Sequence, residues 1–222
     1  MSSVETTTRP AKTGGVRRMA MIFATAGFGV LLLLSEVLDP VGDGTPENLL
    51  SAATNASGRM ISSSLLLLVS SVLLVPAIVG IIRLTPRRGA GLANAGAVLL
   101  VMGGLGHAMA ATYYLVVSAL PGSGLDSTEI HSVLQHLDSA PNLAISFVFI
   151  VSFGFGLLFS FIGLRRAGAV PTWVLGAVIA AFLMEVAAPG GQGIALVKQG
   201  LGVVAFGYLA FALNRGIEAQ TS

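Results

Sequence analysis

The chain contains no cysteine and few charged residues. Of its 222 residues none is Cys, and only 10% are Asp, Glu, Lys or Arg. The absence of cysteine excludes disulfides, thiolate nucleophiles, thiolate metal sites and iron–sulfur clusters. Soluble proteins carry about 25% charged residues, so this chain has too few charges to cover a surface that faces water. Most of its surface is therefore expected to face lipid.

Apolar residues make up 54% of the chain and are concentrated in six segments. About 20 consecutive apolar residues cross the hydrocarbon core of a bilayer, and each segment approaches or exceeds this length. The expected spans cover residues 19–38, 61–84, 89–120, 142–164, 170–188 and 194–213. The sequence predicts an all-α integral membrane protein with six transmembrane helices arranged as three helical hairpins.

The charges of the connecting loops predict how the bundle is oriented. With six spans, every lysine and arginine except Arg59 and Lys198 falls on one side of the membrane. Basic residues favour the cytoplasmic side, so both termini are expected to be cytoplasmic in a multi-pass protein of the plasma membrane. We expect residues 1–18 to be a disordered cytoplasmic tail, 19–214 the transmembrane bundle and 215–222 a short cytoplasmic tail.

Two short helices are expected outside the spans. Thr45, Pro46 and Glu47 form a helix-start pattern, with proline at the first helical position. Residues 127–138 combine another helix start with an apolar stripe. This second segment is predicted to be an amphipathic helix that lies on the outer membrane surface between spans three and four.

The odd-numbered spans share a polar pattern. Arginine pairs open the first, third and fifth spans, at residues 17–18, 87–88 and 165–166. A single ionisable residue follows in each span, and these are Glu36, His107 and Glu185. The pattern favours three parallel hairpin repeats. The alternative is that any three hairpins need cytoplasmic arginines and polar exits.

His107 lies near the middle of the third span and is the most deeply placed histidine. Gly103, Gly104 and Ala111 share its face of the expected helix, at spacings of three and four residues. Small residues let a neighbouring helix approach closely, so His107 is expected to face protein. An ionisable group within a membrane favours a functional site. The alternative is a neutral imidazole that hydrogen-bonds a neighbouring helix.

Two ion pairs are expected at the outer ends of the spans. Glu185 lies near the end of the fifth span and Lys198 near the start of the sixth, so the short turn between them matches their depth. Either charge alone would be costly there, which favours pairing. Glu36 and Arg59 bracket the first outer loop and are expected to pair in the same way. The alternative function of both pairs is to clamp helices together.

The functional hypothesis places His107, Glu185 and Lys198 in one outward-facing polar cavity, with Tyr113 or Tyr114 beside them. Buried acidic, basic and imidazole groups together can relay protons or bind a small polar solute. In the fourth span, Ser152, Gly156 and Ser160 form a small-residue seam suited to close helix packing, while the phenylalanines of that span are expected to face lipid or a partner.

These residues favour a transport-type protein, or one that handles a proton or small solute. The alternative is a non-catalytic membrane subunit or interaction protein, and an intramembrane oxidoreductase is the least favoured class. No catalytic residue, metal site or cofactor is predicted, because haem in a membrane usually needs two axial histidines on facing helices and only His107 is deep enough. The expected partners are the lipid bilayer, a proton or small polar solute, and a second copy or another membrane protein. Nucleic acid is not expected, because the net charge is only +2 and the basic residues flank apolar segments.

Overall fold

The computed structural model describes residues 13–42, 44–137, 140–187 and 192–221, and it is helical wherever it is regular. Six apolar helices are present in these ranges: α1 (Thr13–Leu38), α3 (Ser57–Leu84), α4 (Ala90–Ala119), α6 (Ala140–Arg166), α7 (Thr172–Ala187) and α8 (Gln192–Thr221). The shorter elements are α2 (Pro46–Asn55), α5 (Ser127–Leu137) and a 3-10 turn, η1 (Leu120–Gly122). No strand occurs in the described ranges, which confirms the predicted all-α class.

Five helices are long and apolar enough to cross a membrane, namely α1, α3, α4, α6 and α8. The sixth apolar helix, α7, has only 16 residues. Large hydrophobic side chains are exposed on all six helices, as expected where a helix contacts lipid rather than water. The chain is therefore compatible with a helical membrane protein. It has five candidate membrane-spanning helices and, in addition, one shorter apolar helix.

Both terminal helices extend into the expected tails. Helix α1 begins at Thr13, so residues 13–18 are helical, and α8 continues to Thr221 through most of the expected tail at 215–222. Residues 1–12 and 188–191 lie outside the described residues, and the second range includes residue 188, the last one expected for span five. Hydropathy locates the apolar part of a helix, whereas its backbone hydrogen bonds can continue into polar flanking turns.

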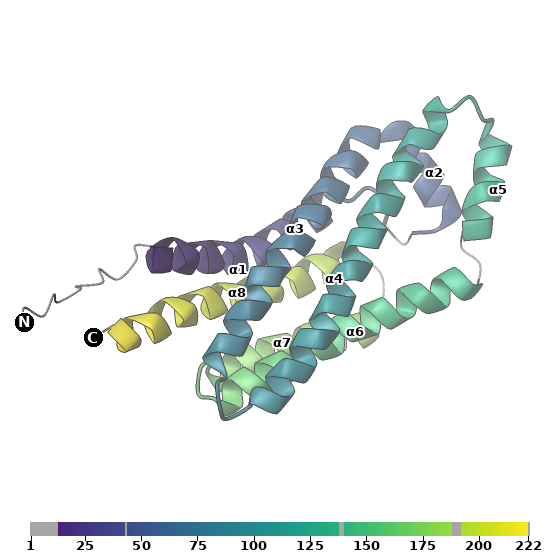
Figure 1. The fold of residues 1–222 in the computed structure, drawn as a ribbon. Coiled ribbons are helices and arrows are strands. Elements are labelled where there is room, and N and C mark those ends of the chain that lie inside the picture. Colours follow the sequence, from purple (N-terminus) through teal and green to yellow (C-terminus); the bar gives the residue numbers. More distant parts are fainter. Residues whose placement is uncertain (1–12, 43, 138–139, 188–191, 222) are drawn as a thin grey trace, which may run out of the picture.

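The six apolar helices pack around a common core (Figure 1). Each contacts the next in the order α1, α3, α4, α6, α7 and α8, and α8 packs back against α1. Every helix places a buried residue in the shared core, and these are Phe28, Leu74, Leu100, Phe161, Val174 and Leu209. Phe161 is fully buried, so the expectation that the phenylalanines of α6 face lipid or a partner is wrong at this position.

Helices α4 and α6 approach closely along their small residues. A Cβ atom added at Gly96 would lie 2.4 Å from Ser160 Oγ, and one added at Gly156 would lie 2.8 Å from the backbone nitrogen of Leu100. Such distances leave no room for a side chain. The predicted close packing along the seam of α6 is therefore confirmed at Gly156 and Ser160.

Helix α2 starts where its helix-start pattern predicts. Thr45 is the N-cap, and its hydroxyl accepts a hydrogen bond from the Asn48 backbone N–H at 3.4 Å. Pro46 occupies the first turn, where its missing N–H would have had no partner in the helix. The helix buries Leu49, Ala52 and Ala53 against the ends of α3 and α4.

Helix α5 packs on α2 instead of lying on the membrane with its whole apolar stripe. Ile130 and Leu134 are buried in a cluster with Leu49 and Val117, whereas Val133 and Leu137 remain exposed. The predicted helix is therefore present, and protein rather than lipid covers Ile130 and Leu134. The reason is that α2 lies beside α5 (Figure 1). The buried Leu49 of α2 belongs to the same cluster, so these side chains are removed from water by protein contacts.

The two ends of the bundle differ in charge. We call the end that holds Glu36, Glu185 and Lys198 the acidic end. We call the opposite end the arginine end. Its described arginines are Arg17, Arg18, Arg83, Arg87, Arg88, Arg165, Arg166 and Arg215. Arg18 ties the two termini together there, because it donates hydrogen bonds to the backbone and side-chain oxygens of Asn214 at 2.8 and 2.9 Å.

Candidate functional site

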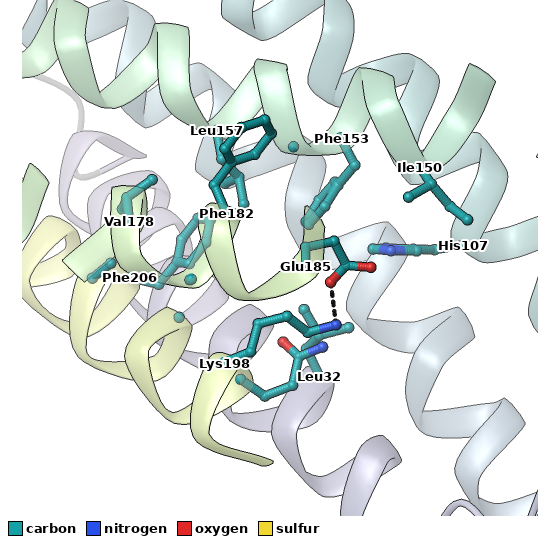
Figure 2. Close-up of a pocket in the computed structure, with 15 residues that line it drawn as sticks. Leu32, His107, Ile150, Phe153, Leu157, Val178, Phe182, Glu185, Lys198 and Phe206 are labelled. Atoms are coloured by element: carbon teal, nitrogen blue, oxygen red, sulfur yellow. Dashed lines mark hydrogen bonds and ion pairs between the residues drawn. The ribbon is translucent and has the colours of Figure 1, made fainter. Parts of the chain in front are cut away.

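A cavity of about 140 Å³ lies between α6, α7 and α8, closed at the back by one residue each from α1 and α4. We call it the histidine cavity. Its polar lining consists of His107, Glu185, Lys198 and Gln199, and most of the remainder is apolar, including Leu32, Phe153, Leu157, Val178, Phe182 and Phe206 (Figure 2). One buried water needs about 10–15 Å³, so the cavity has room for several waters or a small solute.

His107 is held in place by its neighbour Phe153 on α6. The two ring centroids are 4.5 Å apart. The contact requires small residues on α4, because a Cβ atom added at Gly103 would lie 2.5 Å from Cβ of Phe153. His107 therefore faces protein, as its small-residue neighbours predicted.

The imidazole of His107 contains a buried atom that lacks a partner. Nδ1 is inaccessible to solvent and makes no hydrogen bond with any of the residues that the structure describes. Leaving a buried polar atom unpaired costs about 1–3 kcal/mol. Nδ1 is therefore an unsatisfied hydrogen-bonding atom of a residue that lines the cavity.

Glu185 and Lys198 form the predicted ion pair. The Lys198 ammonium donates a hydrogen bond to Oε2 of Glu185, across the connection between α7 and α8. Figure 2 shows the Glu185 side chain extending toward both Lys198 and His107. The pair is only partly buried, since the side chains keep 39% and 24% of their surface exposed. Its charges are therefore accessible from the cavity.

Lys198 connects the three ionisable residues that the repeat pattern relates. It pairs with Glu185, and it lies within electrostatic reach of both Glu36 and His107. Gln199 lies close enough to Glu36 to interact with its carboxylate. Gln199 is not among the residues predicted for the site, although an amide beside Lys198 in an apolar span is a detectable signal. The structure thus brings Glu36, His107 and Glu185 around one lysine.

A second and more polar cavity adjoins the first at the acidic end. We call it the acidic cavity; it has a volume of about 490 Å³ and is lined by α1, α2, α3, α8 and the loop after α1. Its charged lining is Glu36, Asp39, Arg59 and Lys198. Lys198 lines both cavities. The predicted set of Glu36, Arg59, Glu185, His107 and Lys198 is therefore divided between two neighbouring spaces.

The predicted pair between Glu36 and Arg59 is not formed within the described residues. Both line the acidic cavity, but the charge of Arg59 acts on Asp39 instead. Burial raises the pKa of Asp39, and this effect is partly offset by the Val41 backbone N–H at 3.0 Å and by Arg59. The prediction failed because the loop after α1 places Asp39 nearer to the guanidinium.

Tyr114 lines neither of the two cavities, although it lies within electrostatic reach of Glu36 and Asp39, which line the acidic cavity. It packs with Val117 at the acidic end, and its ring centroid is 5.7 Å from that of Tyr113. A helical wheel places Tyr114 on the His107 face of α4. It does not show that Tyr114 joins residues of α2 and α5 in one apolar cluster and does not line the histidine cavity.

The described residues contain no group of three metal-binding side chains. The two histidines of α5 have other neighbours, as His131 lies 3.7 Å from Glu47 Oε1 and His136 Nδ1 lies 2.8 Å from the Ser132 carbonyl oxygen. The available chemistry of the histidine cavity is that of a carboxylate, an ammonium and an imidazole. These groups can exchange protons or bind a polar solute through charge-assisted hydrogen bonds.

Comparison with known proteins identifies no relative, because no family profile, curated protein or solved structure matches the chain. Function therefore has to be inferred from the geometry of the two cavities.

Proposed function

We propose that the chain is a six-span protein of the plasma membrane, built as three helical hairpins with both termini in the cytoplasm. The contacts between α1 and α3, α4 and α6, and α7 and α8 support the hairpins. At about 1.5 Å per residue, α7 is about 24 Å long, a few ångströms short of a bilayer core of about 30 Å. Local thinning of the bilayer accommodates such a mismatch at modest cost. The arginine end faces the cytoplasm under the positive-inside rule.

Within this bundle, the histidine cavity is the proposed site for a proton or a small polar solute in a transport-type protein. The observation that supports it is the buried, unpartnered Nδ1 of His107, beside an ion pair and next to unoccupied volume. A solute or water that hydrogen-bonds Nδ1 would recover the cost of leaving that atom unpaired. Ionisable residues at membrane depth are otherwise expensive to keep.

The acidic cavity is the proposed entrance to this site. It lies at the end that the charge distribution assigns to the outside, and Lys198 borders both cavities. A solute that reaches Lys198 from the acidic cavity is next to Glu185 and within electrostatic reach of His107. An outward-facing polar site with an apolar inner lining follows from this arrangement.

A second candidate is a non-catalytic subunit or interaction protein in which the polar groups only hold helices together. The formed Glu185–Lys198 pair supports it, because such a pair links α7 to α8 without any ligand. An intramembrane oxidoreductase is the third class. It would give purified protein a visible absorption spectrum from its redox group, which separates it from the other two.

Proton flux in liposomes tests the leading proposal. We compare the wild type with His107→Phe, which keeps a ring against Phe153 but removes the titratable nitrogens, and with His136→Phe on α5 as the matched control. Vesicles loaded with a pH-sensitive dye receive an imposed pH gradient. Wild type and His136→Phe should dissipate the gradient faster than protein-free vesicles, and His107→Phe should lose this activity. Equal rates for the folded wild type and His107→Phe would instead support the clamping function.

A further inference from the structure

A recess at the arginine end is lined by Arg88, Gly89, Arg165, Arg166 and Thr172. Arg88 and Gly89 lie in the connection between α3 and α4, whereas Arg165 and Arg166 end α6 and Thr172 begins α7. The positive-inside rule accounts for basic residues at this end of the bundle. It does not account for their convergence on one recess, which depends on how the helices pack.

Two contacts bring the connections together. Gly89 has a φ of +80°, and a Cβ atom added there would lie 2.1 Å from the Gly163 carbonyl oxygen, so the start of α4 touches the last turns of α6. Nε of Arg165 donates a hydrogen bond to the Thr172 hydroxyl at 2.9 Å, across the turn from α6 to α7. Thr172 therefore fixes the Arg165 guanidinium beside the recess.

No described side chain neutralises the guanidinium groups of the recess. Among the described residues, no hydrogen bond or ion pair engages Arg88, Arg166 or the terminal nitrogens of Arg165. The carboxylates whose side chains are described lie elsewhere, and they are Glu36, Asp39, Glu47, Asp126, Glu129 and Glu185. The recess therefore carries an excess of positive charge.

The backbone around the recess adds to this positive charge. Helices α4 and α7 both begin there, and helix N-termini carry partial positive charge. The C-terminus of α6 carries the opposite charge, but its last carbonyls already accept hydrogen bonds from Ala167, Gly168 and Ala169 at 2.9 to 3.1 Å. The arginines are consequently not needed to cap α6.

We propose that this recess binds a phosphate group, supplied by the headgroup of an anionic phospholipid. Guanidinium forks match the oxygens of phosphate in a bidentate arrangement, and three of them converge here. The lipid source follows from Trp173, which adjoins Thr172, is 56% exposed and packs against Tyr208 with ring centroids 5.5 Å apart. Exposed tryptophan beside tyrosine is typical of the level of the headgroups in a bilayer.

Trp173 also supplies the test, because it is the only tryptophan of the chain. The full chain is reconstituted in phosphatidylcholine vesicles that contain a minor fraction of phosphatidylglycerol. Bromine atoms on the acyl chains of one lipid or the other quench tryptophan fluorescence on contact. At equal mole fraction, brominated phosphatidylglycerol should quench Trp173 several-fold more effectively than brominated phosphatidylcholine, and unbrominated phosphatidylglycerol should compete with it.

Two triple variants distinguish the effect of the recess on lipid preference from the effect of the total positive charge at this end. Replacing Arg88, Arg165 and Arg166 with Gln should abolish this several-fold preference, because each arginine near the surface adds to the attraction for anionic lipid. Replacing Arg17, Arg83 and Arg215 with Gln removes the same charge from the same end and should leave most of the preference. An equal loss in both triples would overturn the recess as a specific site.

A second arm distinguishes the source of the phosphate. Inorganic phosphate is titrated onto the detergent-solubilised protein while Trp173 emission is followed. A saturable response without any lipid preference would keep a phosphate site but overturn the lipid source. Equal quenching by the two brominated lipids, with no response to inorganic phosphate, would overturn the proposal, and this comparison requires only the wild type.

Discussion

The two faces of α6 pack differently against their neighbours: one is in close contact with α4, and the other borders a cavity. Toward α4 it presents Gly156 and Ser160, and the helices approach until an added Cβ atom would lie 2.8 Å from the backbone. Toward α7 and α8 it presents Ile150 and Leu157, and the histidine cavity remains between the helices. The difference shows that side-chain size along one helix decides where neighbours touch and where space for a ligand persists.

The largest effect is expected from filling the close contact between α4 and α6. In Gly96→Leu the new side chain would overlap Ser160 and force the helices apart, which should lower the free energy of unfolding by about 3 kcal/mol. Thermal or chemical unfolding in detergent measures the loss. Gly207→Leu on α8 is the matched control, because nothing lies within 4 Å of its added Cβ atom. Similar losses in both variants would show that the small-residue contact is not what stabilises this junction.

A smaller effect is expected on the cavity side, at the Glu185–Lys198 pair. Lys198→Met leaves the Glu185 carboxylate without its cation and should cost about 2 kcal/mol, less than for a fully buried pair because both side chains are partly exposed. The double variant Glu185→Gln, Lys198→Met removes both charges and should recover most of the loss. Unfolding free energies of the two single variants and the double variant give the coupling. Purely additive losses would mean that the pair does not clamp α7 to α8.

The smallest effect is expected at Asp39, which lines the acidic cavity next to the histidine cavity. Burial raises the pKa of Asp39 in the folded protein above its ordinary value of 3.8. A raised acid pKa means that the carboxyl favours folding below pH 3.8 and that this contribution is lost as the pH rises through the folded-state pKa. Asp39→Asn should therefore gain stability relative to wild type with rising pH over that range.

Unfolding measured across pH in detergent tests this sign. The asparagine side chain can still accept the Val41 hydrogen bond, so the comparison isolates the charge. A stability difference that does not vary with pH, or that favours the wild type as the pH rises, would contradict a buried Asp39. It would also mean that water reaches past Asp39 into the acidic cavity, toward Lys198.

Local patterns were sufficient for several features of the site. The short turn between α7 and α8 makes them antiparallel neighbours, so Glu185 and Lys198 could be paired from their positions in the sequence. Small residues around His107 predicted its protein-facing side, and the contact with Phe153 confirms it. These inferences succeeded because they depend on helix periodicity and chain connectivity alone.

Other features depend on contacts between distant segments. The predicted pair between Glu36 and Arg59 did not form because the loop after α1 brings Asp39 within reach of Arg59. Tyr114 does not line the histidine cavity, because it packs in an apolar cluster with residues of α2 and α5. The recess at the arginine end could not be predicted from the sequence either, because Arg88 and Arg165 are far apart along the chain. Nothing in a hydropathy pattern says which helix ends will meet.

The all-helical, lipid-compatible character of this protein was determined by its sequence alone, as were the starts of its short helices and the small-residue seam of α6. Apolarity, capping and residue size are properties of neighbouring positions in a helix. Only the tertiary structure decided that Glu36, His107 and Glu185 surround Lys198, that two cavities meet at this lysine, and that three arginines share one recess. The physical reason is that the order in which apolar helices pack depends on the fit of whole surfaces, which residues distant in the chain create together.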